Sequence, residues 1–177
     1  LLELCGLGKE YLERYPVDAF GGPDAASDDF TPVQKAINYA MTSPLTTGGI
    51  RGGSKRLTKR FYPRTFNLGC RKALFESLGG FDETMRYGED IDFSMRLYEA
   101  DSRVALLPEA VLYHKRRVDL RKFYRQVWHS GTARVELSRR HPGSMRLTYL
   151  LPTLFVVATL LFTLLAVWCP WFWLYHV

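Results

Sequence analysis

The sequence predicts an α/β fold in which short strands alternate with amphipathic helices, followed by a helix that crosses a membrane. Three observations support this prediction. Apolar residues recur at helical spacing in several segments, short β-like runs separate these segments, and residues 148–175 contain no Asp, Glu, Lys or Arg. Alternating strands and helices are typical of layered α/β architectures.

The composition favours about one domain that meets an anionic partner. The 177 residues carry a formal net charge of +6, and the basic residues cluster at 55–64, 114–125 and 133–146. Such clusters suit nucleic acid, lipid headgroups or the diphosphate of a sugar nucleotide. The three cysteines are far apart and form no CxxC pair. A disulfide framework or zinc site is therefore not expected, and a reducing compartment fits best.

The first elements are a helix over residues 1–14 and a short strand over 17–22. The helix already includes residue 1, so we expect an internal or processed start. The strand runs into Gly21, Gly22 and Pro23, which indicate a turn.

A second helix is expected over 32–42, because Pro32 suits a first turn. The glycine-rich and basic segment 44–66 does not satisfy the phosphate-loop pattern GxxxxGK[ST], so we interpret it as a mobile surface loop.

The later elements alternate again. A short helix follows Asn67 and is closed by Gly79 and Gly80, and a second amphipathic helix begins within GEDIDFSMRLYEA. Two β-like runs, VALL and AVLYH, flank Pro108. A basic amphipathic helix over 119–141, interrupted or bent near Gly131, leads to the membrane segment.

The C-terminal run is long enough to cross the hydrocarbon core, which needs about 20 apolar residues. Pro152 suits its start, Pro170 ends or kinks it, and the aromatic residues from Trp168 to Tyr175 resemble an interfacial belt. The preceding arginines predict that the region before this run lies in the cytoplasm at the cell membrane, with single-pass or multi-pass topology. A buried core helix is the alternative interpretation, and a hairpin that continues beyond residue 177 remains open.

Three acids, Glu89, Asp90 and Asp92, stand at the start of a predicted helix. Either Glu89 or Asp90 can cap the helix, and Asp92 with Arg96 can form an i,i+4 ion pair. One carboxylate is enough for a cap, so capping does not account for the Glu89–Asp90 pair. We therefore interpret Asp92 as a helix partner of Arg96 and keep the pair as candidates for chemistry.

The order of motifs closely resembles the C-terminal half of an inverting glycosyltransferase of family 2, with the Rossmann-like GT-A type fold. The motifs are FNLGCRKALFESLGGFDE with Asn67 and Arg71, then GEDIDFSMRL, a strand ending in YH, and LRKFYRQVWHSG. The likeness covers roughly residues 15–146, and the membrane segment resembles members that build exopolysaccharide or other surface glycans. It implies part of a catalytic domain over 1–146 and a transmembrane segment over 147–177.

The resemblance also implies residue roles. Asp90 is the expected general base, which takes the proton of an acceptor hydroxyl while that oxygen attacks the anomeric carbon of a nucleotide sugar; a helix N-terminus suits an ionised base. His114 is expected to help hold a divalent cation, Mg²⁺ or Mn²⁺, or to bind the diphosphate. The expected substrate-binding residues are Glu89, Asn67, Arg125, Gln126 and Trp128.

Each of these assignments has a simpler alternative. His114 is otherwise an ordinary surface or core histidine, and the segment around Arg125 a solvated or membrane-facing basic helix. The Gly21–Pro23 stretch is more simply a tight turn. Departure from the QxxRW pattern of processive synthases favours transfer of one sugar.

Family members also carry an N-terminal half with an Asp-x-Asp motif that holds the metal. No such motif stands upstream of residue 17. We therefore expect a fragment that lacks the donor-binding half and is inactive alone. The alternative function is a non-catalytic membrane-associated module of a glycan-assembly complex. Nucleic-acid binding is not expected, because no recognisable module accompanies the basic charge and the membrane segment argues against it.

Overall fold

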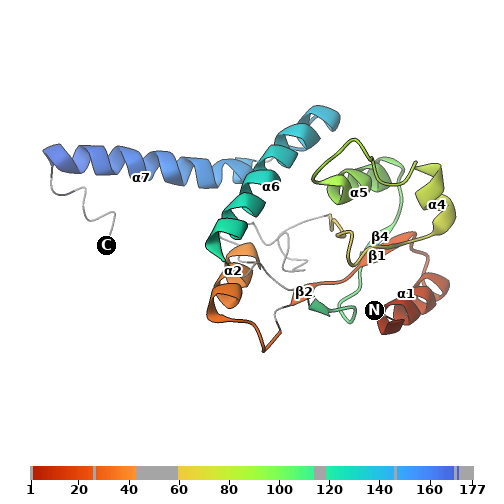
Figure 1. Cartoon of the computed structure of the whole chain (residues 1–177). Helices are drawn as coiled ribbons and strands as arrows, with labels where there is room; N and C mark the ends of the chain where they lie inside the picture. Colours follow the sequence, from red (N-terminus) through yellow and green to blue (C-terminus); the bar gives the residue numbers. More distant parts are fainter. Residues whose placement is uncertain are drawn as a thin grey trace. The chain divides into compact units, whose positions relative to one another are not determined.

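The computed structural model describes residues 2–25, 27–42, 60–113, 119–145, 147–169 and 171, with the backbone alone for residues 2–7 and 148. The chain divides into two compact units, Leu1–Ser144 and Met145–Val177. The first unit is an α/β domain and the second contains one long helix (Figure 1).

The first unit combines short strands with helices. Its strands are β1 (Ala19–Gly21), β2 (Asp24–Ala25), β3 (Gly69–Cys70), β4 (Val104–Leu106) and β5 (Leu112–Tyr113). Its helices are α1 (Leu2–Arg14), α2 (Pro32–Thr42), α4 (Lys72–Ser77), α5 (Glu89–Glu99) and α6 (Leu120–Arg140). In the three-stranded sheet, β1 is the middle strand, antiparallel to β3 and parallel to β4. A second sheet joins β2 and β5 in parallel.

Helices cover both faces of the three-stranded sheet (Figure 1). Ala19 of β1 packs with Phe93 and Leu97 of α5, and α4 adds partly buried side chains to the same cluster. The next residue, Phe20, belongs to a separate cluster with Tyr11 of α1. Successive side chains of a strand point to opposite faces, so β1 divides the unit into a layer with α1 and a layer with α4 and α5.

The predicted helix over 32–42 has the observed bounds of α2. The basic helix is also confirmed as α6, where the Asp119 carboxylate accepts from the Lys122 backbone N–H at 2.7 Å. Of the interruption or bend predicted near Gly131, the interruption is wrong, because α6 is continuous over 21 residues. One glycine costs a helix only about 1 kcal/mol, which a helix packed against a core tolerates.

Residues 60–66 are not the mobile loop that the sequence predicted. The Tyr98 hydroxyl donates to the Phe61 carbonyl at 2.6 Å and accepts from the Phe61 backbone N–H at 3.0 Å. Ser94 donates to the carbonyl of Pro63 at 3.3 Å. These long-range bonds hold the segment on α5. The remainder of the predicted loop, residues 44–59, lies outside the described residues.

The turn predicted at Gly21–Pro23 is wrong, because these residues join β1 to β2 without a turn or bend. The stretch passes very close to another part of the backbone. An ideal Cβ built on Gly22 would lie 1.7 Å from the carbonyl oxygen of Ala110. The Asn67 amide donates to the Gly22 carbonyl, and Leu107 N–H donates to the Gly21 carbonyl at 2.8 Å. Glycine at position 22 therefore permits a contact that any side chain would prevent.

The second unit consists of a 3₁₀ turn over Leu147–Leu150 and α7 (Leu151–Trp168), with Pro152 in the first turn of the helix. The 18 residues of α7 have a mean hydropathy of 2.2, and only 6% of them are buried. The helix is therefore long and apolar enough to cross a membrane. The low burial argues against a core helix. Pro170 lies outside the described residues, and α7 ends before it, with Cys169 as its C-cap.

Replacing Gly22 with Ala should lower the free energy of unfolding by about 3 kcal/mol, because the methyl group cannot avoid the Ala110 carbonyl unless the backbone moves. The matched control is Gly131→Ala, where nothing lies within 4 Å of an ideal Cβ. That change should stabilise the chain by up to about 1 kcal/mol through helix propensity. Urea unfolding of the 177-residue chain in detergent measures both effects. Parent-like stability of Gly22→Ala would contradict the close approach.

Candidate active site

A pocket of about 480 Å³ lies between the start of α5 and one face of α6. Its lining includes two acidic side chains, Glu89 and Asp90. It also includes five basic side chains: Arg64, Arg86, Lys122, Arg125 and Arg134. A concave site with this excess of positive charge suits a ligand that carries negative charge.

Asp90 lies in the first turn of α5 and contacts two groups. Its Oδ1 accepts from the Ile91 backbone N–H at 2.8 Å, and its Oδ2 lies 3.5 Å from Nη1 of Arg64. The side chains of Asp90 and Arg64 are 15% and 14% exposed. The carboxylate is thus held in one orientation beside a compensating positive charge, and it still lines the pocket.

Gly88, rather than Glu89 or Asp90, occupies the N-cap of α5, and no side chain caps the helix. Gly88 has φ of +86°, a left-handed conformation that favours glycine. Its ideal Cβ would lie 3.1 Å from the Cβ of Ala133 on α6. The prediction of an acidic cap is wrong because the backbone itself makes the turn, which leaves Glu89 and Asp90 beside the pocket.

Arg64 reaches Asp90 because its own segment is fixed. Asn67 is 3% exposed, and its Oδ1 accepts from the Arg64 backbone N–H at 3.0 Å. Its amide nitrogen donates to the Gly22 carbonyl. Both amide atoms of Asn67 therefore bind the chain itself, which favours a structural role over the substrate contact that the sequence predicted.

The face of α6 toward the pocket includes Arg125 and Gln126, two of the expected substrate-binding residues. Lys122 and His129 lie on the same face, one turn before and after. Trp128 is not among the residues that line the pocket, and its side chain is 60% exposed. The structure therefore brings two of the three predicted α6 residues to the pocket.

His129 also forms part of an aromatic pair at the pocket wall. Its ring stacks on that of Tyr87, with centroids 4.1 Å apart and planes 17° apart. The Tyr87 hydroxyl lies 3.3 Å from Nε2 of His129. Lys122, His129 and Arg64 were not predicted as pocket residues. Lys122 and His129 could have been found from their helical spacing to Arg125 and Gln126, whereas no local pattern marks Arg64.

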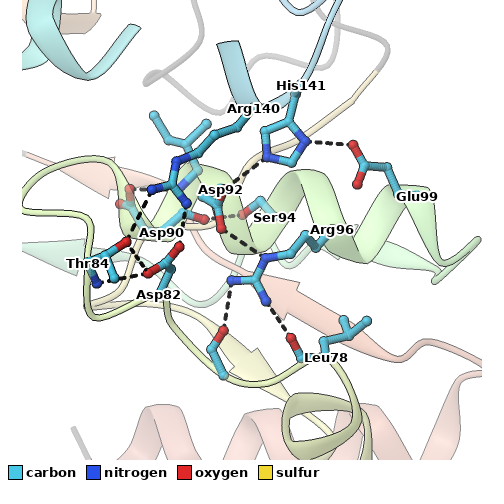
Figure 2. Close-up of polar contacts among 12 residues, drawn as sticks. Leu78, Asp82, Thr84, Asp90, Asp92, Ser94, Arg96, Glu99, Arg140 and His141 are labelled. Atoms are coloured by element: carbon cyan, nitrogen blue, oxygen red, sulfur yellow. Dashed lines mark hydrogen bonds and ion pairs between the residues drawn. The ribbon is translucent and has the colours of Figure 1, made fainter. Parts of the chain in front are cut away.

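Asp92 faces away from this pocket and is confirmed as the partner of Arg96, whose Nε lies 2.9 Å from its Oδ2 (Figure 2). Arg96 also donates to the carbonyls of Leu78 at 2.5 Å and Gly80 at 2.8 Å. The other oxygen of Asp92 lies 2.9 Å from Nε2 of His141, a contact that the sequence did not predict.

The described pocket residues do not fit a divalent cation. Five basic side chains surround two carboxylates, and the carboxylate of Asp90 already faces Arg64. Within the described part of the chain, no three His, Cys, Asp or Glu side chains gather as a metal site. His114, the predicted ligand, lies outside the described residues.

Comparison with known proteins identifies the family. The family model for glycosyl transferase family group 2 matches residues 54–177, more than half of the chain, so the chain belongs to this family. Membership implies a GT-A type α/β fold, which agrees with the observed layers. No solved structure matches the chain.

Two kinds of curated relative were found. The "Pre-mycofactocin glycosyltransferase" of Mycobacterium tuberculosis is 42% identical over 74 residues, which cover 41% of this chain and 16% of the relative. The "Succinoglycan biosynthesis protein ExoA" of Rhizobium meliloti is 25% identical over 149 residues, which cover 81% of this chain and 45% of the relative. The chain thus spans less than half of the length of each relative.

Asp90 and Asp92 should respond differently to loss of charge. Asp92→Asn should lower the free energy of unfolding by about 3 kcal/mol, because Arg96 and His141 would lose a buried partner. Asp90→Asn should cost less, about 1 kcal/mol, because an amide oxygen can still accept from the Ile91 N–H and only the 3.5 Å contact with Arg64 is weakened. Denaturant unfolding of both variants measures the difference. Equal losses would contradict the division between a structural and a pocket carboxylate.

Proposed function

We propose that the natural protein is an inverting glycosyltransferase. It would transfer one sugar from a nucleotide-diphosphate sugar to a glycan or lipid-linked acceptor in cell-surface polysaccharide synthesis. The observation that carries this proposal is the placement of Asp90, oriented by Arg64 and the Ile91 N–H, in a pocket lined by basic side chains. The relative named for succinoglycan biosynthesis supports a glycan product.

The residues suit the two charge changes of such a transfer. Asp90 takes the proton of the acceptor hydroxyl while the hydroxyl oxygen bonds to the anomeric carbon. The bond from that carbon to the diphosphate oxygen breaks at the same time, and the diphosphate leaves with an additional negative charge. Lys122 and Arg125 on α6 offer positive charge to a phosphate on the side of the pocket opposite Asp90, as inversion at the anomeric carbon requires.

Glu89 and Gln126 complete the proposed acceptor site. Both line the pocket, and both side chains are partly exposed. A carboxylate and an amide accept hydrogen bonds from sugar hydroxyls, and the amide also donates them. They are therefore suited to orient the acceptor so that one hydroxyl reaches Asp90.

We also propose that the cell membrane holds this protein, with the catalytic part in the cytoplasm. α7 has the length and hydropathy of a membrane span. The outward face of α6 adds apolar side chains that are between 47% and 69% exposed: Leu120, Tyr124, Val127, Trp128 and Val135. Tyr and Trp suit the membrane interface, and α6 also carries basic residues for anionic headgroups. Trp128 is therefore better explained as an interface residue than as a substrate contact.

In the full-length natural protein, Asp90→Asn should lower kcat by about 10²- to 10⁴-fold, because the acceptor loses its base. Membrane association and folding should be unchanged. Transfer from a panel of radiolabelled nucleotide sugars, with isolated membranes as the source of acceptor, measures the effect. Glu109→Gln, an exposed acid outside the pocket, is the control. Unchanged transfer by Asp90→Asn would remove Asp90 from the mechanism and favour a non-catalytic membrane-associated module.

Replacing Leu160 and Leu161 with Arg should release the protein from membranes. Both lie within α7, and each Arg near the centre of a span costs about 2.5–3.5 kcal/mol on insertion scales. Alkaline carbonate extraction of membranes that contain the full-length protein measures the result, with the double Ala variant as control. If the Arg variant remains in the pellet, α7 does not anchor the protein.

A further inference from the structure

We propose that His141 is a positioning residue, which as an imidazolium holds the C-terminal end of α6 on α5 and thereby keeps the pocket residues of α6 opposite Asp90. This inference rests on the proposed function, since it concerns the geometry of the same site. No motif in the sequence pointed to His141.

The contacts of the ring determine its protonation. His141 follows α6 directly and is 9% exposed. Its Nε2 lies 2.9 Å from Oδ1 of Asp92, and its Nδ1 lies 2.6 Å from Oε1 of Glu99 (Figure 2). An ionised carboxylate only accepts hydrogen bonds, and a neutral imidazole has only one N–H. The ring satisfies both carboxylates only when both nitrogens carry a proton.

The charges around His141 favour this form. Oδ2 of Asp92 binds Arg96, so Oδ1 is the oxygen that faces His141. The neighbouring Arg140 is paired with Asp82 and with Glu136. The charged groups near the ring come from α5, from α6 and from the segment before α5: Asp82, Glu83, Asp92, Arg96, Glu99 and Arg140. Burial alone lowers the pKa of His141, but the hydrogen bonds to Asp92 and Glu99 outweigh burial and raise the pKa above 6.5.

The same contact controls how α6 meets the pocket. Leu137, 1% exposed, packs on Ile91 and Met95 of α5, so α6 rests on α5 near this residue. His141 fixes the end of α6 on the C-terminal side of Leu137, and Arg125 lies on the N-terminal side of Leu137. At 1.5 Å per residue, movement of the His141 end by about 1 Å swings the Arg125 end by roughly 2 to 3 Å. Displacements of this size in an active site cost up to about 10²-fold in rate.

The sign of the pH effect follows from the raised pKa. Below about pH 6.5 the ring is protonated in the folded and the unfolded chain, and the stabilisation is complete. As the pH rises through the folded-state pKa, the ring loses a proton and one of its two carboxylate contacts. Activity and stability that depend on His141 therefore decline on the alkaline side.

The first experiment needs no enzymatic activity. Nitrogen-15 spectra of the four histidines in the 177-residue chain, recorded in detergent between about pH 5 and 9, follow the protonation of each ring. The signals missing from a His141 variant assign His141. We expect both its nitrogens to be protonated at the acidic end and its pKa to lie above the ordinary histidine value. A pKa at or below that of an ordinary histidine would overturn the proposal.

The second experiment measures transfer by the full-length natural protein between pH 6 and 9. His141→Gln should lower kcat roughly tenfold near pH 7, because an uncharged amide cannot donate to both carboxylates in the same geometry. His141→Lys keeps a positive charge, so it should restore most of the activity and lose the alkaline decline. Arg139→Gln removes a charge from an exposed position of the same turn and should behave like the parent.

The two experiments separate the failure of this inference from the failure of the proposed function. If Asp90→Asn is inactive but His141→Gln has the parent's pH profile, or if His141→Lys is no better than His141→Gln, the positioning role is wrong. If Asp90→Asn is fully active, the proposed function is wrong, and the nitrogen-15 spectra still test the imidazolium. Should His141→Gln not fold, the signals missing from His141→Lys assign His141 in the parent spectra, and the pH profile of His141→Lys tests the role of the charge.

Discussion

Asp92 is the buried charge on which the arrangement around α5 depends. A carboxylate that is 3% exposed needs hydrogen-bond partners, because water cannot solvate it. Its two oxygens bind Arg96 from the same helix and His141 from the end of α6. Arg96 extends the contact to the carbonyls of Leu78 and Gly80. The turn before α5, the helix itself and the end of α6 must therefore assemble together (Figure 2). The pocket is a product of that assembly, because its two sides are α5 and α6.

Asp90 and Asp92, two acids of the same helix, have different roles. Asp92 faces the interior and binds Arg96 and His141, whereas Asp90 lines the pocket with Arg64 beside it. A helix separates residues two positions apart by about 200°, so neither role interferes with the other. Gly88 contributes because it has no side chain and therefore leaves room for Ala133 of α6 beside the start of α5.

The sequence predicted what depends on local spacing. The bounds of α2, the start of an acidic helix and the Asp92–Arg96 pair all follow from residues within four positions of each other. Contacts between distant segments left no such signal. Asp92 and His141 are 49 positions apart, and Asn67 and Gly22 are 45 apart. The outward position of Trp128 was missed because helical spacing defines the faces of α6 but not which of them meets the domain.

The contact between Gly88 and Ala133 sets how closely α5 and α6 approach. An ideal Cβ at position 88 would already lie 3.1 Å from the Cβ of Ala133, so glycine and alanine permit this close approach. Both residues line the pocket, so the approach limits the width of the pocket at this point. A larger residue at either position would act as a spacer. The width of the pocket and the charge of its lining can therefore be changed by separate sets of residues.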